Sequence, residues 1–266
     1  MRKAAAGRRS DRLVCTSAMN RPCVSAALLV IGILFTARFA AAQEQEKDCG
    51  APTELVQDDP KLPLLAARLK QHKPVKIVAI GGSSTAGAAA QSPLQSYPER
   101  LEETLAERYP GVEITVVNKG VPRQTAQEMV DRFAKDVVAE DPVLAIWETG
   151  TTDAVRGIDV DSFTATLEAG IAALRARDIE VMLVDMQYSR RTASIIGFDR
   201  YLATMHHVAD VQEVYLFKRF EIMHFWSENG TFNFEDVPKA DRGRLAAEVY
   251  DCLAHRIADA IDYAIQ

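Results

Sequence analysis

The sequence has few aromatic residues and few cysteines, and it lacks the usual signatures of phosphate, dinucleotide and metal sites. Aromatic residues occupy only 7% of its 266 positions, and no segment repeats at a solenoid or propeller period. The glycine-rich segment Gly81–Gly87 is not followed by Gly-Lys-Ser/Thr, and it lacks the glycine spacing of a dinucleotide-binding motif. No group of His, Cys, Asp and Glu has the spacing of metal ligands. We therefore expect no cofactor and no metal, in a chain whose 48% hydrophobic and 26% charged residues are typical of a globular protein.

Residues 1–42 differ from the rest of the chain. Basic residues come first, an apolar run follows over Val24–Ala37, and Ala40-Ala41-Ala42 ends the segment. This order is typical of a secretory signal peptide, since fourteen helical residues span about 21 Å, less than the ~30 Å hydrocarbon core. An uncleaved N-terminal anchor is the alternative, and Met19 is a second candidate for the translation start. We expect a periplasmic or secreted protein with no membrane attachment in its mature form.

The predicted mature chain is acidic. Residues 1–42 hold seven of the 31 basic and one of the 37 acidic residues, so the remainder carries 24 basic and 36 acidic residues, a net charge of −12. Such a charge repels polyanions, so we expect neither nucleic acid nor an anionic membrane as a partner. It favours a neutral or apolar ligand.

Two of the four cysteines, Cys15 and Cys23, lie in the predicted signal peptide, which leaves Cys49 and Cys252 in the mature chain. In an oxidising compartment this pair predicts one disulfide that joins the N-terminal segment to the last helix. Two unpaired, partly buried thiols are the alternative.

Residues 43–74 are predicted to form a polar, proline-rich strap with one short helix over Lys61–Gln71, and residues 75–266 to form one domain. Apolar runs predict strands at Val75–Ile80, Glu113–Val117, Val143–Trp147, Glu180–Asp185 and Val214–Phe217. Helical spacing predicts helices at Gln95–Arg108, Gln124–Ala139, Asp161–Arg177, Gly197–Ala209 and Lys239–Ile265, with an irregular loop over Glu221–Val237. Alternating strands and helices favour a parallel sheet covered on both faces. Right-handed crossovers then predict a three-layer α/β/α sandwich with a five-stranded, flavodoxin-like sheet.

The loops after the first three predicted strands are rich in small and polar residues, at the sheet edge where ligands of such folds bind. They are Gly81-Gly82-Ser83-Ser84-Thr85-Ala86-Gly87, Asn118-Lys119-Gly120-Val121 and Glu148-Thr149-Gly150-Thr151-Thr152-Asp153. Small residues permit a tight turn that leaves backbone N–H groups free beside Ser83. Ser83 is therefore a candidate nucleophile or ligand contact, and a serine that only forms the turn is the alternative.

In their order, spacing and strand context, these loops resemble the short sequence motifs, or blocks, of the SGNH/GDSL hydrolase family. They also resemble an exported branch of that family, whose first block is Gly-Ser-Ser-Ser-Thr-Ala-Gly. The resemblance covers about residues 75–265. It implies that Ser83 is the nucleophile, and that the N–H groups of Ser83 and Gly120 form an oxyanion hole with the side chain of Thr152. It also implies cleavage of acyl or acetyl esters of carbohydrates or lipids in the cell envelope.

Two departures from the family pattern bear on catalysis. The asparagine of the third block is Thr152, whose shorter side chain donates one hydrogen bond, and loss of one oxyanion donor typically costs ~10²–10³ in turnover. The Asp-x-x-His of the last block is Asp236-Val237-Pro238-Lys239, which lacks the histidine. A serine hydroxyl is a poor nucleophile without a base. Three interpretations stay open: His224 oriented by Asp236, Lys239 with a pKa lowered by burial, and a pseudo-enzyme that only binds an envelope glycan or another ligand.

Further substrate contacts are predicted near the same sheet edge. Gln187 and Tyr188 follow the fourth predicted strand, and Trp226 lies among aromatic residues that suit sugar rings or alkyl chains. A small satellite core beneath a long loop is the alternative for these aromatic residues. His206 and His207 are expected to be ordinary residues of a helix surface, without a role.

Overall fold

The computed structural model describes residues 49–194 and 197–266, which belong to one compact unit, residues 46–266. The predicted signal peptide and the alternative start at Met19 lie outside the described residues. One parallel sheet has the strand order β2-β1-β3-β4-β5, so the predicted flavodoxin-like fold class is confirmed. The strands are β1 (Val75–Gly81), β2 (Ile114–Gly120), β3 (Leu144–Glu148), β4 (Glu180–Val184) and β5 (Tyr215–Phe217).

The central strands are continuous apolar runs because helices cover both faces of the sheet. Every residue of β3 is buried, and in β1 all but Lys76 are buried. Gly81 pairs with Gly120 across β1 and β2, and Ile80 pairs with Trp147 across β1 and β3. The first three strands therefore end level, which brings the three loops that follow them to one edge of the sheet.

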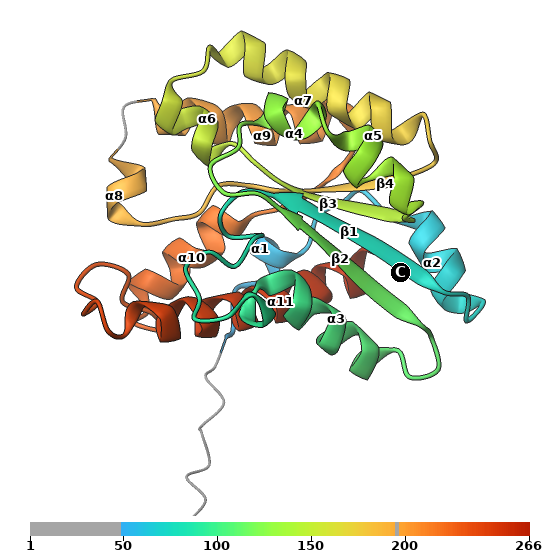
Figure 1. The fold of residues 1–266 in the computed structure, drawn as a ribbon, viewed down its shortest axis with the longest axis horizontal. Coiled ribbons are helices and arrows are strands. Elements are labelled where there is room, and N and C mark those ends of the chain that lie inside the picture. The colour runs from blue at the N-terminus through green and yellow to red at the C-terminus, as the bar shows by residue number, and fades with distance from the viewer. Residues whose placement is uncertain (1–48, 195–196) are drawn as a thin grey trace, which may run out of the picture. The chain divides into compact units, whose positions relative to one another are not determined.

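The helices form one layer on each face of the sheet (Figure 1). One layer contains α1 (Thr53–Val56), α2 (Pro63–Lys70), α3 (Tyr97–Arg108), α10 (Arg219–Glu228) and α11 (Arg242–Ala264). The other contains α4 (Ala126–Val130), α5 (Phe133–Asp136), α6 (Thr151–Arg156), α7 (Val160–Arg175) and α9 (Phe198–Gln212). Three shorter elements complete the chain: η1 (Pro93–Gln95), η2 (Val138–Glu140) and α8 (Arg190–Ala193). Successive residues of β1 point into different cores, with Ile77 in the first and Val78 in the second.

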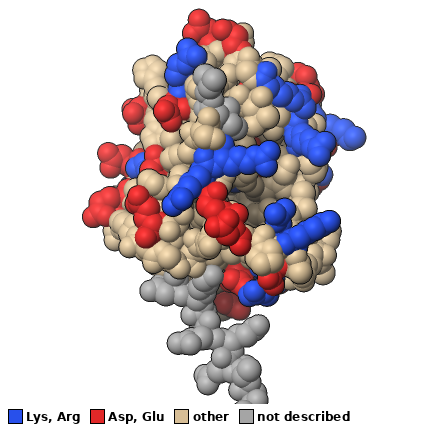
Figure 2. Space-filling view, turned by 90° about the vertical axis from the view of Figure 1, so that its left-hand side faces the viewer, with Lys and Arg blue, Asp and Glu red and all other residues tan. Residues whose placement is uncertain are grey.

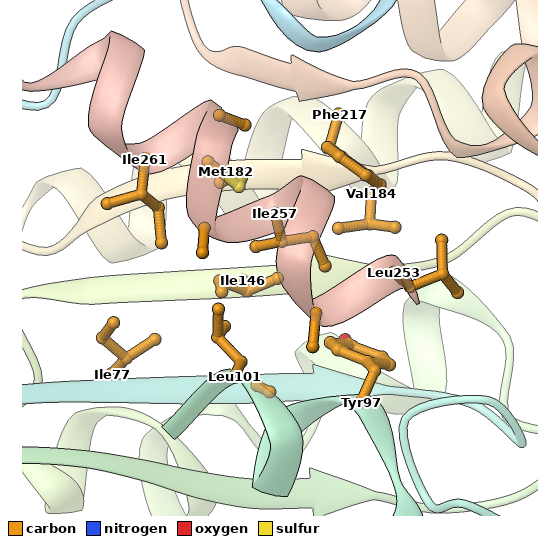
Figure 3. Close-up of a cluster of buried hydrophobic side chains, with 14 of the residues drawn as sticks. Ile77, Tyr97, Leu101, Ile146, Met182, Val184, Phe217, Leu253, Ile257 and Ile261 are labelled. Carbon is orange, nitrogen blue, oxygen red and sulfur yellow. The ribbon is translucent and has the colours of Figure 1, made fainter. Parts of the chain in front are cut away.

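Helix α11 supplies much of the first core. Leu253, Ile257 and Ile261 recur every fourth residue, are buried, and point toward the strands (Figure 3). The helix begins at Arg242 rather than at the predicted Lys239, because a turn closed by the bond from the Asp241 N–H to the Pro238 carbonyl (2.9 Å) precedes it.

Two predicted segments differ in the structure. The helix expected over 124–139 is divided into α4, α5 and η2, and its backbone leaves helical geometry at Arg132 (φ −109°, ψ 5°). The Arg132 guanidinium bonds to the Lys119 carbonyl (2.7 Å), which ties this break to the end of β2. The loop predicted over 221–237 is wrong for its first half, which is part of α10. Ile222 and Trp226, one helical turn apart, are fully buried, and this burial favours helix over loop.

The described part of the predicted strap is anchored to the domain. Cys49 and Cys252 form a disulfide with their Cα atoms 5.3 Å apart, so the predicted pairing is confirmed. The Trp226 indole N–H donates to the Gly50 carbonyl at 3.0 Å. Within residues 49–194 and 197–266, no helix has both the length and the apolar character needed to span a bilayer.

Candidate active site

Ser83 lies in a tight turn that directly follows β1. The Ala86 N–H donates to the Gly82 carbonyl at 3.0 Å, and a Cβ atom at Gly81 would lie 2.1 Å from Thr85 Oγ1, so this turn requires glycine there. Ser83 is exposed, and in the described part of the chain neither its hydroxyl nor its N–H has a hydrogen-bond partner. A free hydroxyl and a free amide therefore lie at the predicted edge of the sheet.

Gly120, at the end of β2, packs against this turn. A Cβ atom at Gly120 would lie 2.2 Å from the Ala86 nitrogen, so any larger residue would displace the turn. The Gly120 N–H donates to Asn118 Oδ1 at 2.9 Å, and Asn118 Nδ2 donates to the Thr85 carbonyl at 2.8 Å. Because the Gly120 N–H is bonded within its own loop, its predicted role in the oxyanion hole requires Asn118 to release it.

A small pocket of about 70 Å³ lies beside Ser83. Its lining includes three threonines of the loop after β3: Thr149, Thr151 and Thr152. The hydroxyls of Thr149 and Thr151 are buried and have no hydrogen-bond partner among the described residues. A buried hydroxyl without a partner carries an unrelieved desolvation cost, which a ligand oxygen would relieve. The sequence predicts only Thr152 as a side-chain donor, because the absence of hydrogen-bond partners at Thr149 and Thr151 depends on the three-dimensional packing.

A buried ion pair lies beneath the turn. Arg219 Nη2 and Glu148 Oε1 are 3.1 Å apart, and their side chains are 1% and 6% exposed. Glu148 Oε2 also accepts hydrogen bonds from the Gly82 N–H (3.0 Å) and the Thr85 hydroxyl (2.8 Å). Burial of two charges is unfavourable unless such bonds offset it. Both oxygens of Glu148 already accept hydrogen bonds. Glu148 therefore positions the Ser83 turn rather than removing the proton of the Ser83 hydroxyl. The signal in the sequence for this role is an acidic residue that ends an otherwise apolar strand.

Asp153 joins the loop after β3 to the helix layer. The Ala126 N–H, at the start of α4, lies 3.1 Å from both carboxylate oxygens of Asp153. Burial raises the pKa of Asp153 to about 6, although its backbone hydrogen bonds act in the opposite direction.

A larger cavity of about 360 Å³ adjoins the small pocket. Ser84 and Gln187 line both cavities, and the Ser84 hydroxyl donates to Gln187 Oε1 at 3.2 Å. Apolar side chains of α11 form part of its wall, and its charged lining residues are Arg191, Arg219, Arg242 and Glu235. Figure 2, which looks onto the left-hand side of Figure 1, shows a hollow bordered by basic and acidic side chains.

The predicted base does not lie beside Ser83. His224 is on α10, where its ring packs against Tyr188 with centroids 4.5 Å apart and ring planes tilted by 45°. Its Nε2 pairs with a glutamate of the same helix at 3.3 Å. Asp236 and Lys239 are exposed in the segment before α11. No hydrogen bond joins Asp236 to His224 in the described ranges, and none of these three residues lines either cavity.

One of the three predicted substrate contacts lies at the cavities, and the other two do not. Gln187 lies at the junction of the two cavities. Tyr188 and Trp226 are 9% and 0% exposed, belong to the first core, and line neither cavity.

Among the described residues, one group of side chains is close enough to hold a metal ion, namely Asp185, His206 and Glu221. These residues also lie outside both cavities.

Residues 48–266 match the model of a family described as the Non-GDSL lipase-like family. No curated protein matches the chain. Among solved structures, a variant of Axe2, an acetyl-xylooligosaccharide esterase from Geobacillus stearothermophilus, has a TM-score of 0.58 at 20% identity, over 70% of this chain and 94% of that chain. LAE5, an alpha/beta hydrolase enzyme from the metagenome of Lake Arreo in Spain, has a TM-score of 0.58 at 20% identity, over 71% and 96%. TesA has a TM-score of 0.53 at 21% identity, over 68% and 99%. At these identities the likeness establishes the fold.

Proposed function

This chain belongs to the Non-GDSL lipase-like family, and on that premise we propose that it is a serine esterase that cleaves acyl or acetyl esters of carbohydrates or lipids. One observation carries the proposal: the unpartnered hydroxyl and amide of Ser83 lie at the same small pocket as the unpartnered hydroxyls of Thr149 and Thr151. Ester cleavage needs a nucleophile on one side of the carbonyl and hydrogen-bond donors around its oxygen. Axe2, which shares the fold, acts on acetyl-xylooligosaccharides, and this supports an acetyl ester as the substrate.

In the proposed reaction, Ser83 Oγ forms a bond to the ester carbonyl carbon while its proton passes to a base. The oxyanion that develops accepts hydrogen bonds from the Ser83 N–H and from the hydroxyl of Thr152 and its threonine neighbours. The tetrahedral intermediate then collapses, and the alcohol leaves with the proton. Water attacks the acyl-serine by the same steps, which releases the carboxylic acid and restores Ser83.

The proposed base is His224, oriented by Asp236. The His224 side chain is 43% exposed, so its ring can leave Tyr188 and rotate without unfolding the helix that carries it. Asp236 lies in an exposed segment, which supports its movement toward the cavities. Lys239 is the second candidate, from the end of the same segment.

The larger cavity is the proposed site for the rest of the substrate. Because Ser84 and Gln187 line both cavities, one ligand can place its ester beside Ser83 and extend into the larger space. The apolar wall formed by α11 suits an acyl chain or the face of a sugar ring. The arginines suit oxygen-rich or anionic groups on the same ligand.

We also propose that the protein acts in the periplasm or outside the cell after removal of its signal peptide, with neither nucleic acid nor membrane as a partner. The disulfide between Cys49 and Cys252 supports this location, because disulfides persist in oxidising compartments.

Hydrolysis of p-nitrophenyl acetate by the purified mature chain tests the esterase proposal. We expect Ser83→Ala to reduce the rate to background, and we expect Ser162→Ala, which removes an exposed hydroxyl on α7, to keep the wild-type rate. A fluorophosphonate probe should label Ser83 and no other residue. If His224→Ala is labelled as readily as the wild type, His224 is not the base.

A ligand-binding protein without catalysis is the second candidate function. It is favoured by one observation, that no histidine of the described residues lines the small pocket. Equal background rates in the wild type and in Ser83→Ala, together with no fluorophosphonate adduct, would support this function and reject the esterase.

A further inference from the structure

Three side chains that can bind metal meet at a place that the esterase reaction does not use. Asp185 directly follows β4, His206 lies on α9, and Glu221 lies in the first turn of α10. Their sequence separations give no metal motif, which is why the sequence predicted no metal site. Each offers one ligand atom, and the three atoms lie within 4.8 Å of one another.

The distances among these atoms suit a shared ion. His206 Nε2 is 3.4 Å from Asp185 Oδ2 and 3.6 Å from Glu221 Oε1. A tetrahedral zinc ion with bonds of about 2.0–2.2 Å holds its ligand atoms about 3.3–3.6 Å apart. An octahedral magnesium ion with bonds of about 2.0–2.1 Å would bring them to about 2.8–3.0 Å. The two distances from His206 Nε2 therefore fit zinc better than magnesium.

The hydrogen bonding of the group supports a missing ligand. Asp185 is 0% exposed, and although its Oδ1 accepts from the Phe220 N–H (2.8 Å), its Oδ2 has no hydrogen-bond partner. His206 Nε2 and Glu221 Oε2 are likewise buried and without a hydrogen-bond partner among the described residues. Apart from the ion-pair contacts of His206 Nε2 at 3.4 and 3.6 Å, these atoms have no hydrogen bonds within the described part of the chain, which is unusual for buried polar atoms because each carries a desolvation cost.

The charge of the group points the same way. In the form that binds metal, two ionised carboxylates and a neutral imidazole carry a charge of −2, which a divalent cation neutralises. Lys218, whose charge acts on His206, has its Nζ 3.7 Å from a carboxylate oxygen of Asp58. The bond from the Phe220 N–H to Asp185 is the kind of outer contact that orients a carboxylate ligand.

We propose that Asp185, His206 and Glu221 bind one zinc ion, with water as the fourth ligand. The ion fastens α9 and α10 to the end of β4. This fixes the start of α10, where Arg219 pairs with the glutamate beneath the Ser83 turn. Because the ion would lie outside both cavities, its proposed role is to hold these elements together rather than to act on the ester bond.

Isothermal titration of zinc into the untagged mature chain, after removal of metals with a chelator, tests this proposal. We expect one equivalent of zinc to bind, and we expect His206→Gln and Glu221→Gln each to weaken binding by at least ~100-fold. Both side chains are 33% exposed, so these variants should fold even if Asp185→Asn does not. His207→Gln, which changes an exposed histidine next to His206 on the same helix, is the matched control and should bind zinc like the wild type.

Two further readouts separate this site from adventitious binding. Cobalt in place of zinc should give the strong visible absorption of a tetrahedral site in the wild type and not in His206→Gln. Zinc should raise the Tm of the wild type and of His207→Gln, and should not raise that of Glu221→Gln. No stoichiometric binding, or binding that survives His206→Gln, would overturn the proposal and leave a protonated histidine between two carboxylates. Because these measurements use no ester, their result is independent of whether the protein is an esterase.

Discussion

Breaking the buried ion pair beneath the active-site turn should destabilise the protein more when Glu148 is replaced than when Arg219 is replaced. In Glu148→Gln the guanidinium of Arg219 stays at 1% exposure without a counter-charge, and its Nε and Nη1 already have no hydrogen-bond partner among the described residues. Removal of one partner of a buried pair typically costs about 3–5 kcal/mol, because an uncompensated charge remains. We expect Glu148→Gln to lower the free energy of unfolding by that amount.

Arg219→Met should cost less, about 1–3 kcal/mol, because Glu148 keeps the hydrogen bonds from Gly82 and Thr85. The same change also removes the two unpartnered guanidinium nitrogens. The double variant should be about 1–3 kcal/mol more stable than the sum of the two single changes predicts, since neither charge is then left alone.

Urea unfolding of the oxidised mature chain, followed by circular dichroism, measures these differences. Glu103→Gln is the control, since the pair of Glu103 with Arg100 (2.6 Å) lies on the surface and should contribute less than about 0.5 kcal/mol. Additive effects in the double variant, or a larger cost for Arg219→Met than for Glu148→Gln, would refute this account of the pair.

Three further predictions concern the loops of the site. Gly120→Ala should lower the free energy of unfolding by about 1–3 kcal/mol and reduce fluorophosphonate labelling of the turn, because the new Cβ would clash with the backbone of the turn. Gly243→Ala is the control and should be close to neutral, because its Cβ would contact mainly a side chain on the surface. Thr149→Val and Thr151→Val should keep or raise the free energy of unfolding, since each removes a hydroxyl without a hydrogen-bond partner among the described residues. The kcat for p-nitrophenyl acetate should fall by about 10–10³-fold at similar KM. An unchanged kcat would exclude these threonines as oxyanion donors. Burial gives Asp153 a pKa of about 6 in the folded protein, against 3.8 for an unperturbed aspartate, so its contribution to stability is complete below about pH 4 and is lost as the pH rises through 6. Asp153→Asn should remove up to about 3 kcal/mol of this pH dependence in unfolding titrations.

The fold was predictable because its signals are local. Strands such as Val75–Gly81 are β-branched apolar runs closed by glycine, and their alternation with helices leaves few topologies once crossovers are right-handed. The resemblance to SGNH/GDSL hydrolases, drawn from the loops around Ser83, Gly120 and Gly150–Asp153, is confirmed by the family match. The disulfide was predictable for a simpler reason, since the predicted mature chain has only Cys49 and Cys252 to pair.

The rest depends on contacts between residues that are distant in the sequence. Glu148 and Arg219 are 71 positions apart, and nothing near either residue indicates its partner. Trp226, predicted to contact substrate, is instead buried against Gly50, 176 positions away. Whether a hydroxyl such as that of Thr149 has a hydrogen-bond partner is also a property of the folded structure alone.

The site separates into a part that is fixed and a part that is free to move. The Ser83 turn is held by Glu148, Gly120 and Arg219, all of them in or beside the core, so changes there act on stability and on geometry together. Asp236 lies in an exposed segment, which has few contacts to lose. In the proposed reaction this exposed segment supplies Asp236, which orients the base His224 on α10. It follows that substitutions at the exposed Asp236 and Lys239 should change the rate of ester hydrolysis without changing the free energy of unfolding, whereas substitutions beneath the turn should change both.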